Sequence, residues 1–309
     1  MTTGLPAQPD QPRPDRPQPD RPQPDRPQPD HPQAATPVYA ATPEAGARRR
    51  PVSTAFVLGV VAICVLSFLF LLVIGYVVLS VGPAAALICG LLALVPLTAV
   101  LLVVRLIDRW EPEPRGALWF ALLWGAAASV TLALLVDAGV QLFVYAASDG
   151  QALPSDTFGA VVQAPLVEES AKGLGVLLIF LVLRRTFDGP VDGLVYAATV
   201  AGGFAFTENI LYFGSSLVEG GGVSLGVTFA LRGIMGPFAH VMFTACTGIA
   251  LGLASRRRGF WPAAGLFLLG LFCAMLLHAL WNGTTVVADG LEGFLFAYAV
   301  IQVPLFAGA

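Results

Sequence analysis

Residues 54–80 read TAFVLGVVAICVLSFLFLLVIGYVVLS and contain no charged side chain. A run of about 20 apolar residues is long enough for an α-helix to cross the ~30 Å hydrocarbon core of a bilayer. Further apolar runs of similar length follow along the chain, so we expect an all-α, polytopic transmembrane helix bundle of about eight spans. The expected spans are 54–80, 83–107, 116–147, 159–183, 190–213, 225–254, 260–285 and 290–307.

The overall composition agrees with this assignment. Of the 309 residues, 56% are hydrophobic and 12% are charged, whereas about 25% of the residues of a soluble domain are charged. This excludes a soluble cytoplasmic enzyme. A net charge of −3 without a basic domain gives no indication of nucleic-acid binding. The four cysteines lie in apolar runs without a CxxC pair, which predicts buried apolar side chains rather than disulfides or a thiolate metal site.

The N-terminal region, residues 1–50, has a different composition. The pentapeptide RPQPD recurs between residues 11 and 33. Because so many prolines prevent helix and sheet formation, we expect a disordered, extended cytoplasmic arm, separate from a transmembrane domain at 51–309. We interpret the arm as a solvated spacer, with a docking site for a proline-recognising partner as the alternative. It lacks the basic start and apolar core of a cleavable signal peptide.

The arginines predict how the chain is oriented. They cluster at residues 48–50, 105–115, 184–185 and 256–258, whereas the loops at 148–158, 214–224 and 286–289 contain no Lys or Arg. With eight spans, every cluster falls on the same side of the membrane. Basic loops are typically cytoplasmic, so we expect an integral protein of the cell membrane with both termini in the cytoplasm.

Ionisable residues inside the spans are the functional candidates, because a charge in the bilayer is costly unless it has a role. The candidates are Glu168, Glu169, Lys172, Glu208, Arg232, His240 and His278, with Asn209 and Asn282 as uncharged companions. At ~1.5 Å per residue, Glu168, Glu208 and His278 lie roughly 8–14 Å below the outer surface, and His240 lies deeper. We therefore expect the carboxylates and the two imidazoles to converge on one polar cavity. Asp137 also lies within a span, but no motif supports a role for it.

The spacing of these residues predicts which of them act together. Glu168 and Lys172 are four residues apart and share a helix face, as do His278 and Asn282. Glu169 projects about 100° away from Glu168, so we expect the two carboxylates to have different tasks. Lys172 could instead form a charge pair that only locks helix packing, and the structural and functional interpretations of Arg232 are equally supported. Pro237 is expected to kink or tilt the span that carries His240.

Carboxylates and imidazoles around a captured water can hydrolyse a peptide bond in two ways. In the first, Zn²⁺ is held by His240, His278 and Glu208, and a remaining glutamate takes a proton from the bound water. In the second, no metal is present: a Glu–His pair deprotonates the water, and the other histidine stabilises the oxyanion together with Asn282. The spacing does not decide between these schemes.

Other classes of membrane protein remain as alternatives. The signatures HExxH, GxSG and GxGD of other intramembrane proteases are absent from the sequence. A non-catalytic scaffold that binds partner helices could keep the same polar residues. An ion- or proton-coupled transporter could use the buried carboxylates as a relay.

Four motifs occur in order on successive spans. They are EESAK at 168–172, GFAFTEN at 203–209, PFAH at 237–240 and HALWNG at 278–283. Together they resemble the PrsW family of intramembrane (metallo)proteases, which is related to the CAAX-processing and bacteriocin-immunity-type membrane proteases. The resemblance covers roughly residues 85–300.

The resemblance implies a membrane-embedded peptidase that cleaves membrane-anchored proteins, such as the first cut of an anti-sigma factor. It implies that Glu168, Glu169, Glu208, His240 and His278 form the catalytic site, with a metal ion that the sequence does not identify. The CAAX-type branch carries EExxxR and a histidine where this chain has EExxK and Glu208. Both departures favour the PrsW branch, and they argue against a direct transfer of the CAAX-type scheme for activating water.

Overall fold

The computed structural model describes residues 54–288 and 290–308. The expected proline-rich arm at 1–50 lies outside these residues. Within them the chain forms helices and connecting loops and contains no strand, so the all-α prediction is confirmed.

The helices follow the predicted spans closely. The first half contains α1 (Thr54–Val81), α2 (Pro83–Asp108), α3 (Arg115–Leu123), the π-helix η1 (Trp124–Ser129) and α4 (Val130–Ala147). The second half contains α5 (Asp156–Phe158), η2 (Gly159–Gln163), α6 (Ala164–Val182), α7 (Pro190–Phe229), η3 (Ala230–Met235), α8 (Ala239–Ser255), α9 (Phe260–Val287), α10 (Gly290–Ala297), η4 (Tyr298–Gln302) and α11 (Val303–Gly308).

In the described part of the chain, five helical segments are long and apolar enough to cross a membrane. One of them, Pro190–Ser255, contains two of the expected spans. The expected span at 159–183 corresponds to η2 and α6, and α6 carries three charged residues close together, Glu168, Glu169 and Lys172. The last segment, Glu292–Ala307, is a shorter apolar helix. The expected count of about eight spans is compatible with these segments.

The structure corrects one predicted loop. Residues 214–224 were expected to connect two spans, but α7 continues through them to Phe229. Its helical backbone is interrupted only at Gly221, where φ is +67° and ψ is −161°. A residue without a Cβ adopts this conformation at little cost, so a single glycine makes the turn that a loop was expected to make. Pro237 lies between η3 and α8, which confirms the predicted break before His240.

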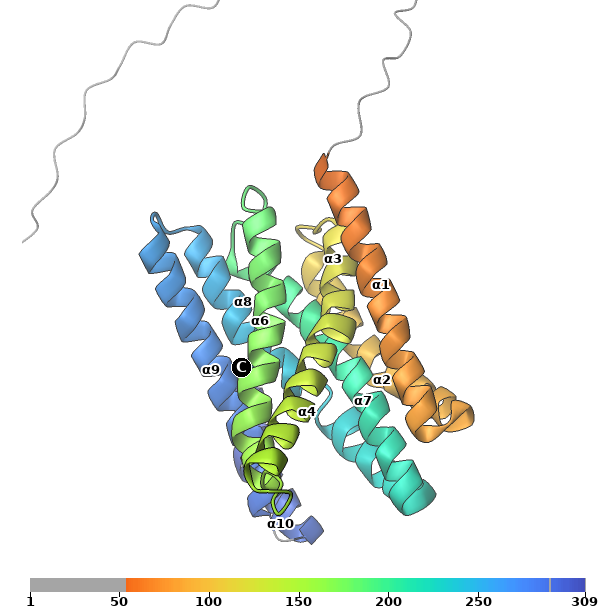
Figure 1. The fold of residues 1–309 in the computed structure, drawn as a ribbon. Coiled ribbons are helices and arrows are strands. Elements are labelled where there is room, and N and C mark those ends of the chain that lie inside the picture. Colours follow the sequence, from red (N-terminus) through yellow and green to blue (C-terminus); the bar gives the residue numbers. More distant parts are fainter. Residues whose placement is uncertain (1–53, 289, 309) are drawn as a thin grey trace, which may run out of the picture. The chain divides into compact units, whose positions relative to one another are not determined.

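Helix α7 packs against helices on several sides, namely α2, α3, η1, α6 and α8. In Figure 1, α6, α8 and α9 stand together on one side of the bundle and α1 on the other. The packing is very close at Gly203, where an added Cβ would lie 2.1 Å from the carbonyl oxygen of Leu122 in α3. This contact fixes the part of α7 that leads to Glu208.

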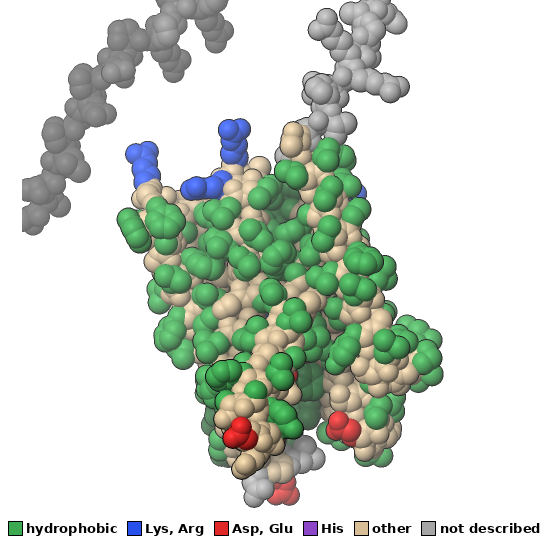
Figure 2. Space-filling model, viewed as in Figure 1, with side chains coloured by type: hydrophobic (Ala, Val, Ile, Leu, Met, Phe, Trp, Pro, Cys, Tyr) green, Lys and Arg blue, Asp and Glu red, His purple; other side chains and the backbone are tan. Residues whose placement is uncertain are grey.

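Basic and acidic side chains lie toward opposite ends of the surface, with an apolar flank between them. Figure 2 shows apolar side chains along the flank, Lys and Arg side chains at one end and Asp and Glu side chains toward the other. We call the first the arginine end; it carries Arg184 and Arg185 after α6 and Arg256–Arg258 after α8. Many large apolar side chains on the flank are exposed, including Leu79 at 88% and Leu142 at 68%. An apolar flank between polar ends is the surface expected of a protein surrounded by lipid.

Candidate active site

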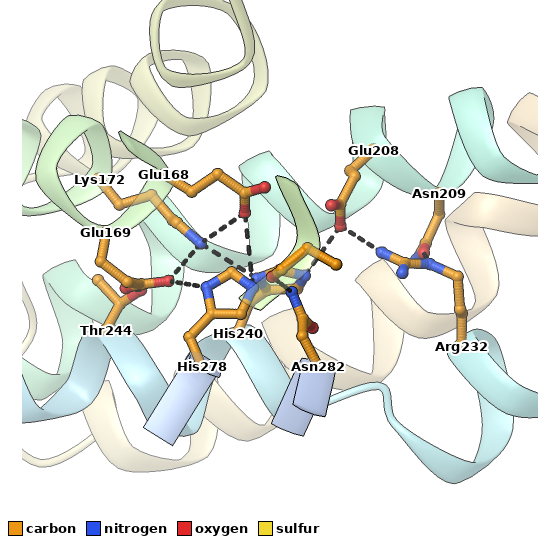
Figure 3. A network of polar contacts seen from close by, with 11 residues as sticks. Glu168, Glu169, Lys172, Glu208, Asn209, Arg232, His240, Thr244, His278 and Asn282 are labelled. Carbon is orange, nitrogen blue, oxygen red and sulfur yellow. Dashed lines mark hydrogen bonds and ion pairs between the residues drawn. The ribbon is translucent and has the colours of Figure 1, made fainter. Parts of the chain in front are cut away.

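Five neighbouring helical segments bring the predicted polar residues into one network, shown in Figure 3. The residues come from α6 (Glu168, Glu169, Lys172), α7 (Glu208, Asn209), η3 and α8 (Arg232, His240) and α9 (His278, Asn282). Most of these side chains are more than nine-tenths buried. The expectation that they lie together is therefore met, and the contacts within the network distinguish their positions.

Glu169 lies behind the wall of the cavity rather than in it. Its Oε1 atom is 2.6 Å from Nζ of Lys172 and 3.0 Å from Nδ1 of His278. Its Oε2 atom accepts a hydrogen bond of 2.9 Å from the hydroxyl of Thr244. Glu169 and Lys172 are completely buried. All of its contacts hold other side chains in place, so the geometry gives Glu169 a positioning task.

His278 and Glu168 face each other across a gap. Because a carboxylate only accepts hydrogen bonds, Nδ1 of His278 carries the proton that it donates to Glu169, and Nε2 is left as an acceptor. This Nε2 atom lies 3.9 Å from Oε2 of Glu168. The Glu168 oxygen is buried and has no hydrogen-bond partner among the described residues, although Nζ of Lys172 is 3.5 Å away. Two acceptors at this distance leave room for a water molecule or a cation between them.

His240 is held from both sides of its ring. Its Nδ1 atom is 3.1 Å from Nζ of Lys172, and its Nε2 atom is 2.8 Å from Oε2 of Glu208. An ammonium group can only donate and a carboxylate can only accept, so Nδ1 is the acceptor and Nε2 carries the proton. His240 therefore has to give up one of these two contacts before it can bind a metal ion.

Glu208 forms the other end of the network. Its carboxylate pairs with the guanidinium of Arg232 as well as with His240. Arg232 also donates a 2.9 Å hydrogen bond from Nε to Oδ1 of Asn209 and lies 4.0 Å over the ring of Tyr212. Arg232 thus neutralises Glu208 and ties η3 to α7, which supports both interpretations of this arginine.

The structure changes one member of the expected metal set. Glu168, His240 and His278 each offer a ligand atom, and these atoms lie within 4.8 Å of one another. The sequence led us to expect Glu208 in place of Glu168, but Glu208 is already paired with Arg232. Two imidazoles and a carboxylate are a common donor set for a catalytic Zn²⁺. The Oε2 atom of Glu168 has no hydrogen-bond partner among the described residues, although Nζ of Lys172 lies 3.5 Å away, so this oxygen remains available as a ligand atom.

A cavity of about 560 Å³ opens beside the network. Glu168, Glu208, His240 and His278 line it, and Glu169 and Lys172 do not. Asn282 also lines the cavity, but its Nδ2 donates a 2.8 Å hydrogen bond to the carbonyl oxygen of Ala160 in η2. One amide hydrogen of Asn282 is therefore used to join α9 to η2, which leaves less of its capacity for an oxyanion.

Sequence reasoning missed several side chains that complete the site. Phe243 stacks on the ring of His278 with the ring centres 4.8 Å apart, and Lys172 lies 4.1 Å over the ring of Phe204. Thr244 follows His240 by four residues, so the helical period places both on one face. That spacing could have identified Thr244, whereas the contacts of Phe204 and Phe243 depend on how the helices pack.

Comparison with known proteins gives the family. Residues 113–309 match the family described as PrsW family intramembrane metalloprotease. The chain belongs to the PrsW family. It is 30% identical over 222 residues to the Protease PrsW of Clostridioides difficile (strain 630). These aligned residues cover 70% of this chain and 84% of that protein. It is also 30% identical over 189 residues to the Protease PrsW of Geobacillus kaustophilus (strain HTA426), covering 59% and 76%. No solved structure matches the chain.

The assignment to PrsW confirms the resemblance found in the sequence. The network from Glu168 to Asn282 lies entirely within the matched region. The protein is an intramembrane protease, and therefore a hydrolase that acts on a protein substrate. Its apolar helices and its family make it an integral membrane protein.

Proposed function

We propose that this PrsW protease cleaves membrane-anchored proteins with a water molecule held between Glu168 and His278. The observation that carries the proposal is the pair of facing acceptors, Oε2 of Glu168 and Nε2 of His278, 3.9 Å apart. Neither atom donates a hydrogen bond, so a water molecule between them can donate to both. The carboxylate of Glu168 acts as the general base and takes the proton that the water donates to it. The oxygen of the water then attacks the carbon of the peptide carbonyl.

The buried residues behind the cavity keep this pair in position. Glu169 holds Nδ1 of His278 and is itself held by Lys172 and Thr244, which directs Nε2 toward Glu168. A carboxylate behind a histidine in this way fixes the tautomer and the orientation of its ring. Glu208 and Arg232 form the facing wall and hold His240 through Nε2.

A metal ion would fit the same residues once His240 releases its contact with Lys172 or with Glu208. Glu168, His240 and His278 would be its ligands, with Zn²⁺ as the ion that this donor set favours. A bound Zn²⁺ supplies a Lewis acid that polarises the substrate carbonyl and lowers the pKa of water. With Glu168 as a ligand, the other carboxylates that line the cavity would be Glu208, which is paired with Arg232, and Asp137.

The charge distribution supports an orientation and a class of substrate. Basic loops are typically cytoplasmic, so the arginine end faces the cytoplasm in our proposal. In α6, Glu168 lies near the opposite end of the helix from Arg184 and Arg185. The cut therefore falls in the outer half of the bilayer, within the span of a membrane-anchored substrate. The first cleavage of an anti-sigma factor, which the family resemblance implies, is a reaction of this kind.

Cleavage of a single-span reporter in liposomes tests the proposal. We expect Glu168→Gln to reduce the cleavage rate by at least about 10³-fold, because an amide cannot take the proton. Glu219→Gln changes a carboxylate near the same end of the bundle, outside the cavity lining, and should leave the rate unchanged. Equal rates in wild type and Glu168→Gln would contradict the proposal.

The same assay in the presence of a chelator tests the metal. Loss of activity that added Zn²⁺ restores, together with bound zinc in the purified protein, would support the metal-bound scheme. Full activity of a preparation that contains no metal would contradict it and favour the scheme in which Glu168 acts on water directly.

A further inference from the structure

A third carboxylate that lines the cavity, Asp137 of α4, has no part in the mechanism above. We propose that Asp137, together with Gln163 of η2, binds a Lys or Arg side chain of the substrate. The protease would then select substrates that carry a basic residue a few positions from the cleaved bond, on the side away from the arginine end. This inference rests on the proposed function.

The contacts of Asp137 leave its charge without a counter-ion. Its Oδ1 accepts a 2.9 Å hydrogen bond from Nε2 of Gln163, and its Oδ2 accepts a 2.7 Å bond from Nε2 of Gln141. Both donors are neutral amides. Within the described ranges, Glu168 and Glu208 each have a cationic partner, but Asp137 forms no ion pair. The Asp137 side chain is exposed at the cavity, so a cationic group of a substrate can reach it.

Gln163 adds an acceptor without a partner next to the carboxylate of Asp137. Its Nε2 is used by Asp137, but its Oε1 is buried and has no hydrogen-bond partner among the described residues. A buried acceptor without a donor is unfavourable. One carboxylate and one amide oxygen side by side suit a group that has several N–H donors and a positive charge. Lys and Arg side chains are such groups, whereas an acidic or apolar side chain would leave the Gln163 oxygen without a donor and the Asp137 charge without a counter-ion.

The site is reachable from the active site and from the surface. A second cavity of about 360 Å³ shares Asp137, Gly159 and Gln163 with the main cavity. Its remaining lining residues include Asp156, and none of the residues that line it is Lys or Arg. Asp137 therefore lies where the two cavities join, on a path with negative charge that leads away from Glu168.

The helix gives the approximate register of the substrate. Gln163 precedes Glu168 by five residues, which corresponds to about 7.5 Å along a helix at ~1.5 Å per residue. An extended peptide advances ~3.3 Å per residue. A basic side chain two to four residues from the cleaved bond can therefore reach Asp137 while the bond lies at Glu168.

Reporters that differ in one charge test the proposal. Each carries Lys, Gln or Glu at a position two to four residues from the cut, as mapped by mass spectrometry of the products. For wild type we expect kcat/KM with Lys to exceed kcat/KM with Glu by about tenfold or more at one position. Asp137→Asn should reduce this ratio to about twofold or less, Asp137→Lys should invert it, and Asp137→Glu should retain it.

The ratio is measured within each enzyme preparation, so a loss of folded protein does not change it. Asp149→Asn, which removes a carboxylate outside both cavities, is the matched control and should keep the wild-type ratio. A preference for Lys that persists in Asp137→Asn, or equal cleavage of all reporters by wild type, would overturn the inference alone. No cleavage of any reporter by wild type would overturn the proposed function and this inference with it.

Discussion

Lys172 has three acceptors within 3.5 Å of its ammonium group, namely Glu168, Glu169 and His240. Burying such charges costs several kcal/mol for each ion, and ion pairing often only just compensates for that cost. Apolar side chains of similar volume in these positions would give at least the same stability. The arrangement is better explained by the task of holding the two histidines in defined tautomers, which is what a water-activating site requires.

Many residues of this site could be predicted from the sequence, because the apolar spans contain few ionisable residues. A charge within a span is costly, so each such residue is a candidate for a functional role. The sequence could not reveal that Glu169 lies behind the cavity wall or that His240 is bound through both nitrogens. Those facts depend on the direction of each side chain toward a neighbouring helix. Asp137 lies within a span but outside every motif, and its contact with Gln163 appears only in three dimensions.

At the arginine end, the carboxyl group of Glu113 makes stability dependent on pH. Burial raises the pKa of Glu113, the hydrogen bond from Tyr196 lowers it and the charges of Asp192 and Asp108 raise it, so that it lies at about 7. In the unfolded chain the pKa is about 4.3. The folded state therefore binds the proton more tightly, so stability falls as pH rises from about 4.3 to 7 and is constant above that.

We expect Glu113→Gln to remove this dependence while keeping an acceptor for the Tyr196 hydroxyl. Its Tm should be close to that of wild type at pH 5 and higher than that of wild type at pH 8. Melting curves between these pH values measure the difference. Glu111→Gln, which changes an exposed neighbour, is the control. A Tm difference that does not change with pH would contradict this account.

At the scale of the helices, α7 is the element on which the site depends most. It carries Glu208 and packs closely against α3 at Gly203. The sequence predicted the start of α7, at residue 190. It did not predict that the helix continues to Phe229, because the glycines at 220–222 look like a loop, and only the structure shows that Gly221 alone leaves the helical conformation.

Gly203→Ala tests this dependence. The new Cβ would lie 2.1 Å from the carbonyl oxygen of Leu122, so α7 has to move away from α3. Overpacking of this kind typically costs about 1–3 kcal/mol, and we expect a lower Tm together with slower reporter cleavage. Gly139→Ala in α4, where nothing lies within 4 Å of the new Cβ, should be neutral or slightly stabilising. Similar effects of the two substitutions would show that the contact at Gly203 is unimportant.

At the scale of the whole molecule, the separation of charge is the basis of the orientation that we propose for the protein in the membrane. Arginines gather at one end, and the loops at the other end lack basic residues (Figure 2). The positions of the arginine clusters can be predicted from the sequence, because they do not depend on how the helices pack. The cavity could not be predicted in the same way, since its walls come from α4, α6, α7, α8 and α9 together.

Cysteine labelling of intact cells tests the orientation. A membrane-impermeant maleimide should label Glu219→Cys, near the end opposite the arginines, and should leave Arg257→Cys unlabelled until the membrane is broken. The wild-type chain, which has four cysteines, sets the background. Labelling of Arg257→Cys in intact cells, with Glu219→Cys protected, would reverse the proposed orientation.

The central claim is that Glu168 and His278 act on one and the same water or ion. Cleavage rates of Glu168→Gln, His278→Asn and the double variant test it most directly. Residues that act as a unit are not additive, so the double variant should be no more than about threefold slower than the slower single variant. A double variant whose loss equals the product of the two single losses would mean that the residues act independently, and it would contradict the account.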